Sequence, residues 1–133
     1  MKLTDPTAIH QLGIDFDAAW NRRDAAAIGG LFLDDADFQV PRGNMFRGRE
    51  RIEQFYARAF ANMPPDRRHS VTFEQVRFLT SDIAIGDGPA LIFRAGAAAD
   101  EEPYLRVLVT IVCHNRHGRW RIAGGRTMIP RNE

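Results

Sequence analysis

The sequence is poor in features that would place it in a membrane or an oxidising compartment. Among its 133 residues, Cys113 is the single cysteine, so no internal disulfide can form. The apolar neighbours of Cys113 favour an inert buried thiol over a reactive one. No apolar run approaches the ~20 residues that span a bilayer, and residues 1–13 lack the apolar stretch of a secretory signal. We therefore expect a cytoplasmic protein with no membrane partner.

The charge balance argues against a nucleic-acid partner. The formal net charge is +1, and arginines, which greatly outnumber lysines, alternate with acidic residues along the chain. Binding to a phosphate backbone needs a clustered surplus of positive charge. The apolar content of 44% and the charged content of 26% are ordinary for one soluble domain, which we place at residues 1–133.

Motifs for cofactor, metal or nucleophile chemistry are also missing. Gly124 and Gly125 lie inside a strand pattern and do not form a phosphate-binding loop. No serine or cysteine nucleophile pattern is present, and no carboxylate or cysteine completes a metal set with the histidines. His69 begins a strand. Only His114, at the end of a long strand, is kept as a possible acid or base. We expect no cofactor and no metal.

Three helices are predicted in the first half of the chain. Apolar residues recur at helical spacing from Asp5 to about Asn21, in a short run at 25–32 that Asp24 can cap, and at 49–61. The pair Pro64–Pro65 stops the third helix. A short strand is predicted at 36–40, between the second and third helices.

The second half of the chain is predicted to be β. Strand patterns cover 68–80, 83–94 and a hairpin at 104–130 with its turn at 115–118. Glycines and a proline at 86–89 predict a bulge or bend in the middle strand. Early helices and late strands indicate an α+β fold, with the helices on one face of an antiparallel sheet.

The first strand of the hairpin is apolar on both faces. Val107, Val109 and Ile111 alternate with a second set that includes Leu108 and Thr110. Such a strand needs two coverings, so we expect helices on one face and a second subunit on the other.

Three segments, at 19–32, 34–56 and 114–126, resemble the nuclear transport factor 2-like superfamily, most closely its SnoaL-like and SgcJ/EcaC-like members. They contain a helix ending before a capping aspartate, a strand that opens with Ala36–Asp37, a glycine-led helix, and a closing strand Gly118–Ile122 of sequence GRWRI. The resemblance implies a cone-shaped roll of three N-terminal helices against a curved, mixed but mostly antiparallel sheet. Proteins of this fold typically bind small apolar molecules inside the cone.

The resemblance and the alternation of side chains together predict the cavity wall. The helices would contribute Phe16, Trp20 and Tyr56, although Trp20 and Tyr56 lie on helical stripes that favour a core role over ligand binding. Arg106 could pair with a ligand carboxylate or lie at the rim. The predicted strand positions are Phe38, Val40, Arg106, Leu108, Thr110, Ala123, Gly125 and Thr127. The opposite set, Val107, Val109 and Ile111, would then form a homodimer interface.

Ketosteroid isomerase activity is excluded by the residues present. The resemblance places the carboxylate base at Val40, the tyrosine donor at Phe16 and the protonated carboxyl at Thr110, and none of these can serve. Of the residues that carry epoxide hydrolysis in this fold, only one has a counterpart in this chain, Arg106. Two hypotheses remain. The first is a protein that binds a small apolar ligand in a mostly hydrophobic cone, either without turnover or as a cofactor-free isomerase, cyclase or lyase. The second is a non-catalytic association module.

Overall fold

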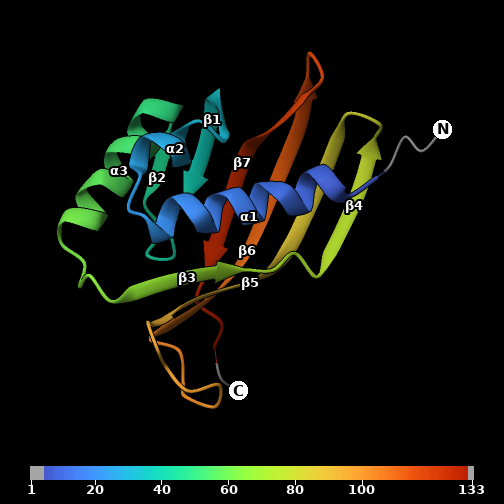
Figure 1. Cartoon of the computed structure of the whole chain (residues 1–133). Helices are drawn as coiled ribbons and strands as arrows, with labels where there is room; N and C mark the ends of the chain where they lie inside the picture. The colour runs from blue at the N-terminus through green and yellow to red at the C-terminus, as the bar shows by residue number, and fades with distance from the viewer. Residues whose placement is uncertain (1–4, 132–133) are drawn as a thin grey trace.

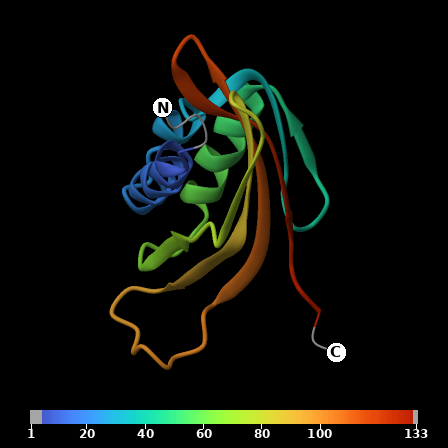
Figure 2. The same ribbon diagram turned by 90° about the vertical axis from the view of Figure 1, so that its right-hand side faces the viewer.

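The structure, a computed structural model, describes residues 5–131 as three helices packed against one curved sheet (Figure 1). Both long helices lie on the concave side of the sheet (Figure 2). The helices and strands in chain order are α1 Thr7–Asn21, α2 Ala25–Gly29, β1 Phe32–Gln39, β2 Met45–Arg47, α3 Arg49–Ala61, β3 Arg67–Val71, β4 Gln75–Thr80, β5 Ile83–Arg94, β6 Leu105–Arg116 and β7 Arg119–Met128.

The predicted α+β class and mixed sheet are confirmed. The strands follow the order β2-β1-β7-β6-β5-β3, with β4 also paired to β5. The pair β1–β7 is parallel and the other pairs are antiparallel. The parallel pair joins the first strand of the chain to the last, so completing the sheet requires pairing between the two ends of the chain.

The helix predictions are confirmed for α1 and α3 and corrected for α2. The Asp24 carboxylate caps α2 by accepting a hydrogen bond from Ala27 N at 3.0 Å, as expected. The helix ends at Gly29, however, and Phe32 already belongs to β1. Phe32 is fully buried in the core as a strand residue. The strand therefore begins four residues earlier than predicted, because tertiary pairing with β7 overrides the short helical pattern.

At 86–89, where a bulge or bend was predicted, β5 changes its partner strand, which explains why the segment 68–80 is two strands. No register shift interrupts the pairing of β5 with β6 from Ile83 to Ile92. β5 pairs with β4 up to Asp87 and with β3 from Ala90 onward. Between them the backbone at Thr72 crosses β5 closely, with Thr72 N donating to Pro89 O at 3.0 Å. The crossing carries Phe73, 7% exposed, into the core.

Cys113 lies at the centre of the sheet and is fully buried. Burial raises the pKa of its thiol to about 12, so the thiol stays protonated at neutral pH. Because the thiolate is the reactive form, this agrees with the inert thiol expected from the sequence.

Candidate functional site

A cavity of about 200 Å³ lies between the helices and the concave face of the sheet. Its wall is almost wholly apolar, and no Arg, Lys, Asp or Glu is among the residues that line it. From the helical side and the α3–β3 connection the wall is formed by Leu12, Gly13, Phe16, Trp20, Phe55, Tyr56, Ala59 and Met63. From the sheet and its loops it is formed by Phe32, Phe38, Val40, Pro41, His69, Val71, Phe73, Ala90, Ile92, Leu105, Val107, Val109, Ile111, Ile122 and Thr127.

The structure places Phe16, Trp20, Phe38, Val40, Tyr56 and Thr127 on this wall, where the sequence put them. Gly125 also faces inward, because an added Cβ would lie 2.7 Å from the Phe38 ring. Ala123 does not line the cavity. It lies at the irregularity between Val112 and Cys113 in the pairing of β6 with β7, where the alternation of side chains is interrupted.

The predicted orientation of β6 is wrong. Val107, Val109 and Ile111 line the cavity, whereas Arg106, Leu108 and Thr110 lie on the outer face of the sheet and are exposed. A dimer interface built on Val107, Val109 and Ile111 is therefore ruled out, since Val107 is 9% and Ile111 3% exposed within one chain.

The pairing register explains which face of β6 is buried. Ile111 lies between Gly86 of β5 and Gly125 of β7, and neither glycine has a side chain to compete for the space. Phe73 and Phe38 pack over those two glycines from the cavity side. The two glycines thus provide room for the rings of Phe73 and Phe38 on the Ile111 face of the sheet.

The main polar feature of the cavity wall is His69, which the sequence analysis did not select. Its Nδ1 lies 2.7 Å from Oδ1 of Asp17, and the two side chains are 10% and 23% exposed. Because a carboxylate only accepts hydrogen bonds, this contact assigns a proton to Nδ1, and in the neutral imidazole Nε2 is then the nitrogen with the free lone pair. No residue within 5–131 hydrogen bonds to Nε2.

The Asp17–His69 pair forms because side chains of α1 hydrogen bond to backbone groups along the unpaired edge of β3. Asp17 and Asn21 lie one turn apart on α1, so they share a face of the helix. Asn21 exchanges two hydrogen bonds with the His69 backbone, at 2.8 and 3.1 Å, and both Asp17 oxygens accept from Val71 N at 3.1 Å. Helix side chains thus replace a missing neighbouring strand, and the same geometry brings Asp17 to the His69 ring.

The ring of His69 is held between aromatic side chains of α1. Its centroid lies 5.2 Å from those of Phe16 and Trp20. Fixed by these contacts and by Asp17, the imidazole has one orientation in the wall. Such a histidine can accept a proton from a bound molecule and return it, which is general base and acid chemistry.

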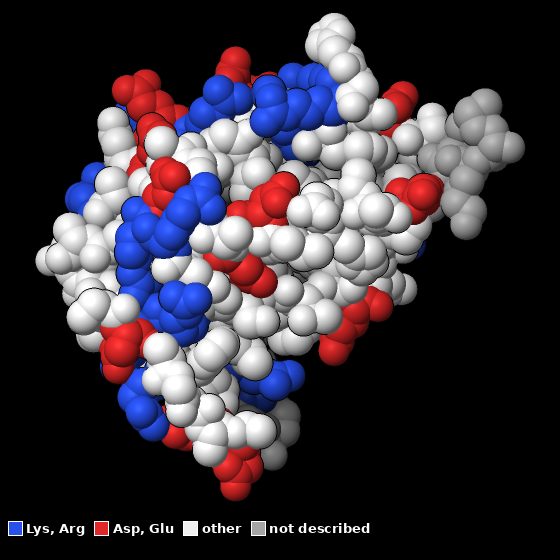
Figure 3. Space-filling model, in the orientation of Figure 1, with Lys and Arg blue, Asp and Glu red and all other residues white. Residues whose placement is uncertain are grey.

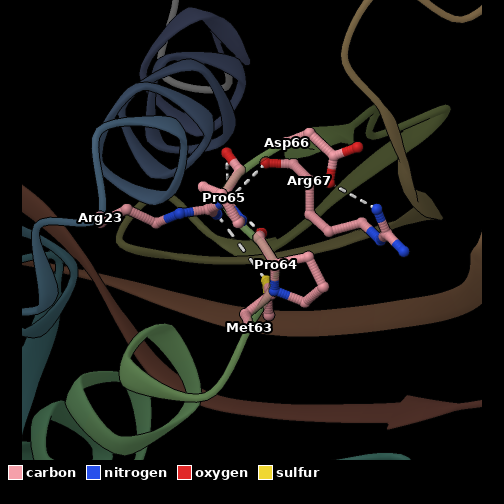
Figure 4. A network of polar contacts seen from close by, with 6 residues as sticks. All are labelled: Arg23, Met63, Pro64, Pro65, Asp66 and Arg67. Carbon is pink, nitrogen blue, oxygen red and sulfur yellow. Dashed lines mark hydrogen bonds and ion pairs between the residues drawn. The ribbon is translucent and has the colours of Figure 1, made fainter.

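Arg23 fixes the connection that leads into β3. Its Nη2 donates to the carbonyl oxygens of Pro64, Pro65 and Arg67 at 3.1, 3.2 and 2.8 Å (Figure 4). The guanidinium also lies over the Trp20 ring, 4.8 Å from its centroid. Burial, and to a lesser degree Arg68, lowers the pKa of Arg23, but a guanidinium stays charged at any ordinary pH. These hydrogen bonds of Arg23 fix the path of the chain toward His69.

Charged side chains are abundant on the surface around the site. Figure 3 shows basic residues gathered beside the C-terminal end of α1, where Arg68 donates to Asn21 O at 3.3 Å. This positive charge lies outside the cavity wall, so the wall itself favours an uncharged ligand.

The catalytic candidates chosen from the sequence do not meet at the cavity. Arg106 is exposed on the outer face of β6. His114 accepts a hydrogen bond from Arg116 Nε at its Nδ1, at 3.0 Å, and does not line the cavity. His69 could have been found from the helix, because Asp17 is a carboxylate between Phe16 and Trp20 on a face that must approach the sheet.

No group of three or more potential metal ligands is present among residues 5–131. In the same part of the chain, no helix has both the length and the apolar character needed to cross a bilayer.

A family model described as the SnoaL-like domain matches residues 1–126, so the chain belongs to the SnoaL-like family. No curated protein gives a significant match to the sequence.

Solved structures share the nuclear transport factor 2-like, cystatin-like fold. A domain of unknown function from Nostoc punctiforme superposes with a TM-score of 0.86 at 23% identity, covering 99% of this chain and 81% of that one. A hexachlorocyclohexane dehydrochlorinase of type 2 gives 0.78 at 17%, covering 94% and 84%. A protein from Xanthomonas campestris named as a calcium/calmodulin-dependent protein kinase II association domain gives 0.78 at 16%, covering 97% and 90%. At these identities the likeness establishes the fold.

Proposed function

We propose that this protein is a cofactor-free enzyme that removes a proton from a small uncharged molecule, with His69 as the base. The observation that carries the proposal is the Asp17–His69 hydrogen bond of 2.7 Å in the wall of an otherwise apolar cavity. Asp17 holds the imidazole in the tautomer whose Nε2 can accept a proton, and it stabilises the imidazolium that results.

The cavity volume supports a ligand of one ring. An apolar cavity of ~150 Å³ accommodates benzene, so about 200 Å³ suits a six-membered ring with one or two small substituents. A steroid is much larger than this space. The absence of charged residues from the wall favours a ligand without charge, because burying an unpaired ion is very costly.

Proton removal leads to two classes of reaction in such a site. The proton can return at another carbon, which is an isomerisation, or a leaving group can depart with the electron pair, which is an elimination. One neighbour of the same fold is by its name a dehydrochlorinase of hexachlorocyclohexane. That name supports an elimination or isomerisation of a small ring in this chain as well.

Deuterium exchange tests the base directly. Nitrocyclohexane is an uncharged ring with one acidic C–H bond, at C1. Incubated with the protein in D2O, it is expected to lose the C1 proton signal in the NMR spectrum faster than in buffer, and added benzene should slow the exchange by competing for the cavity. An exchange rate equal to that in buffer would contradict the proposal.

Association through the outer face of the sheet is a second candidate function. The face carries Leu108 and Met128, paired side by side on β6 and β7 and 38% and 54% exposed. One neighbour is named as an association domain, which supports contact between copies. We propose a homodimer through this face, in place of the ruled-out interface. The expected cytoplasmic location stays a prediction.

Introducing a negative charge on the outer face of the sheet tests the proposed homodimer. Leu108→Asp is expected to convert a dimer into a monomer in size-exclusion chromatography with light scattering, because a buried unpaired carboxylate is strongly unfavourable. Arg106→Asp, on the same face of the same strand but already polar, is the matched control. A wild-type protein that elutes as a monomer at all concentrations would refute the dimer.

A further inference from the structure

The end of the β6–β7 hairpin carries four basic side chains on one face of the sheet. In the pairing of the two strands, His114 lies opposite Arg121 and Arg116 lies opposite Arg119. Ile122, the chain neighbour of Arg121, points inward and lines the cavity. Because successive side chains of a strand point to opposite faces, the four basic side chains lie on the outer face, away from the cavity. We call these four residues the basic block.

The backbone that carries the basic block is fixed by a tight turn. His117 and Gly118 both have a positive φ, of 57° and 78°, which is the geometry of a two-residue type I′ hairpin turn. Arg116 and Arg119 flank this turn directly, and both are exposed. The end of the hairpin projects beyond the neighbouring strands (Figure 1). The basic block is therefore presented to solvent on a defined backbone.

A second pair of arginines in the sheet shows how like charges are usually balanced. Like charges directly opposite each other on neighbouring strands are destabilising. Arg67 of β3 and Arg94 of β5 lie opposite each other, and each has its own carboxylate. Asp66 lies 2.6 Å from Arg67, and Glu101 lies 2.6 Å from Arg94. This pair needs no charge from outside the protein.

The basic block has no such balance. Its nearest carboxylate is Asp35, whose Oδ1 lies 4.0 Å from Arg116 Nη1, too far for a hydrogen bond. The side chains of Arg119 and Arg121 make no hydrogen bond or ion pair with any residue of 5–131, and Arg121 Nε is buried without a partner. Arg116 Nε donates to His114 Nδ1 at 3.0 Å, so the imidazole proton lies on Nε2, which is one more donor.

A further carboxylate near the hairpin is engaged on the other face. Asp82 Oδ1 accepts from Asn115 Nδ2 at 3.3 Å. Asn115 pairs with Trp120, whose ring packs on Phe78 on the inner face of the sheet. On the outer face, three guanidinium groups thus face a single carboxylate among the residues that the structure describes.

We propose that the basic block binds the dianion of a phosphate monoester, at a site separate from the cavity. The planar guanidinium group presents paired donors that match two phosphate oxygens. The surplus of positive charge on this face matches a dianion. Because the four side chains occupy two successive outward-facing pairs, they surround one group, whereas a nucleic-acid backbone needs positive charge spread over a row of phosphates.

The proposed phosphate site does not overlap the proposed homodimer contact. His114 lies six residues from Leu108 on β6, which is roughly 20 Å along an extended strand. Both can therefore be occupied at once.

Titration with glycerol 3-phosphate tests the site, because this molecule carries the phosphate monoester and no ring that could enter the cavity. The backbone amide signals of 114–121 are followed by NMR and are expected to shift in a saturable way. Arg119→Gln and Arg121→Gln should each weaken binding by at least about 10-fold, the worth of one charge-assisted hydrogen bond. Arg106→Gln, on the same face at the other end of β6, is the matched control. Equal affinities of Arg119→Gln and Arg106→Gln overturn the proposal.

A monoanion and a stability measurement make the test decisive. Dimethyl phosphate carries one negative charge and should bind at least about 10-fold more weakly, since each charge-assisted bond loses strength. An equal affinity would mean plain charge screening and overturns the proposal. If Arg121→Gln does not fold, Arg119→Gln decides by thermal unfolding. Glycerol 3-phosphate should raise the midpoint of the wild type and of Arg106→Gln more than that of Arg119→Gln, and the same rise in all three overturns the proposal.

The source of the phosphate is tested with vesicles. Sedimentation with phosphatidylcholine vesicles that contain phosphatidic acid, lost in Arg119→Gln, would assign the phosphate to a lipid headgroup. Binding of glycerol 3-phosphate without such sedimentation would assign it to a free molecule, and either result supports the site. A single-stranded oligonucleotide without a terminal phosphate has only phosphodiester groups. If it binds more tightly than glycerol 3-phosphate and depends on Arg119, the partner is a nucleic acid and the proposal is overturned.

Discussion

Replacing His69 by alanine is expected to lower the rate of deuterium exchange into nitrocyclohexane by ~10²- to 10⁴-fold, the usual contribution of a positioned general base. Among the described residues that line the cavity, the variant removes the only histidine, and no aspartate or glutamate is there to replace it as a base. The backbone bonds between Asn21 and residue 69 do not involve the imidazole, so β3 should stay attached to α1. The thermal unfolding midpoint should therefore change little.

Asp17→Asn separates the role of the carboxylate in structure from its role in orienting the base. The amide oxygen of Asn can still accept from Val71 N, which preserves the helix-to-strand bond. The amide nitrogen, however, would donate to Nδ1 of His69 and so move the ring proton to Nε2. We expect a loss of exchange comparable to that of His69→Ala, together with a thermal unfolding midpoint close to that of the wild type.

His10→Ala is the control for these variants. His10 is an exposed histidine on α1, on the helix that also carries Asp17. The His10→Ala variant should leave the rate of deuterium exchange into nitrocyclohexane unchanged. A wild-type rate in His69→Ala would remove His69 from the mechanism.

Gly88→Ala is expected to lower the free energy of unfolding by at least about 3 kcal/mol, or to prevent folding. An added Cβ at Gly88 would lie 1.7 Å from Thr72 O and 3.0 Å from Glu74 N. These are backbone atoms of the crossing segment, and they cannot move aside without breaking the hydrogen bond from Thr72 N to Pro89 O. Urea unfolding followed by circular dichroism measures the loss.

Two glycines serve as controls for the Gly88 prediction. Gly86→Ala, on the same strand, would place its Cβ 3.3 Å from a side-chain atom of Phe73 and not against backbone, so a smaller loss is expected. Gly30→Ala has no neighbour closer than 3.5 Å and an ordinary helical φ of −63°, so its effect should stay within ~0.5 kcal/mol. Equal stabilities of Gly88→Ala and Gly30→Ala would contradict the close crossing at Thr72.

Local patterns predicted the elements well where one residue type decides the backbone. Asp24 caps α2, the glycines at 86 and 88 mark where β5 changes its partner strand, and the apolar stripe of α1 places Phe16 and Trp20 on the cavity wall. The strand at Phe32 was missed because its partner, Ile122, lies 90 residues later and contributes nothing to the local pattern.

Alternation alone could not assign the faces of β6. Both faces of that strand carry apolar residues, so the sequence predicts two coverings without saying which is the helical one. The register of β6 between Gly86 and Gly125 decides it, because the two glycines provide room for the rings of Phe38 and Phe73 on the Ile111 face. The exposed Arg106 and Leu108 on the other face follow from the same register.

By itself, the sequence determined the fold class, the family and the apolar character of the cavity, because these depend on composition, periodicity and motifs that are local in the chain. Only the tertiary structure brought Asp17 of α1 to His69 of β3, in the wall of the cavity. The physical reason is the edge of β3. Its backbone groups need partners, α1 is the element that reaches them, and the side chains that supply those bonds also hold the base.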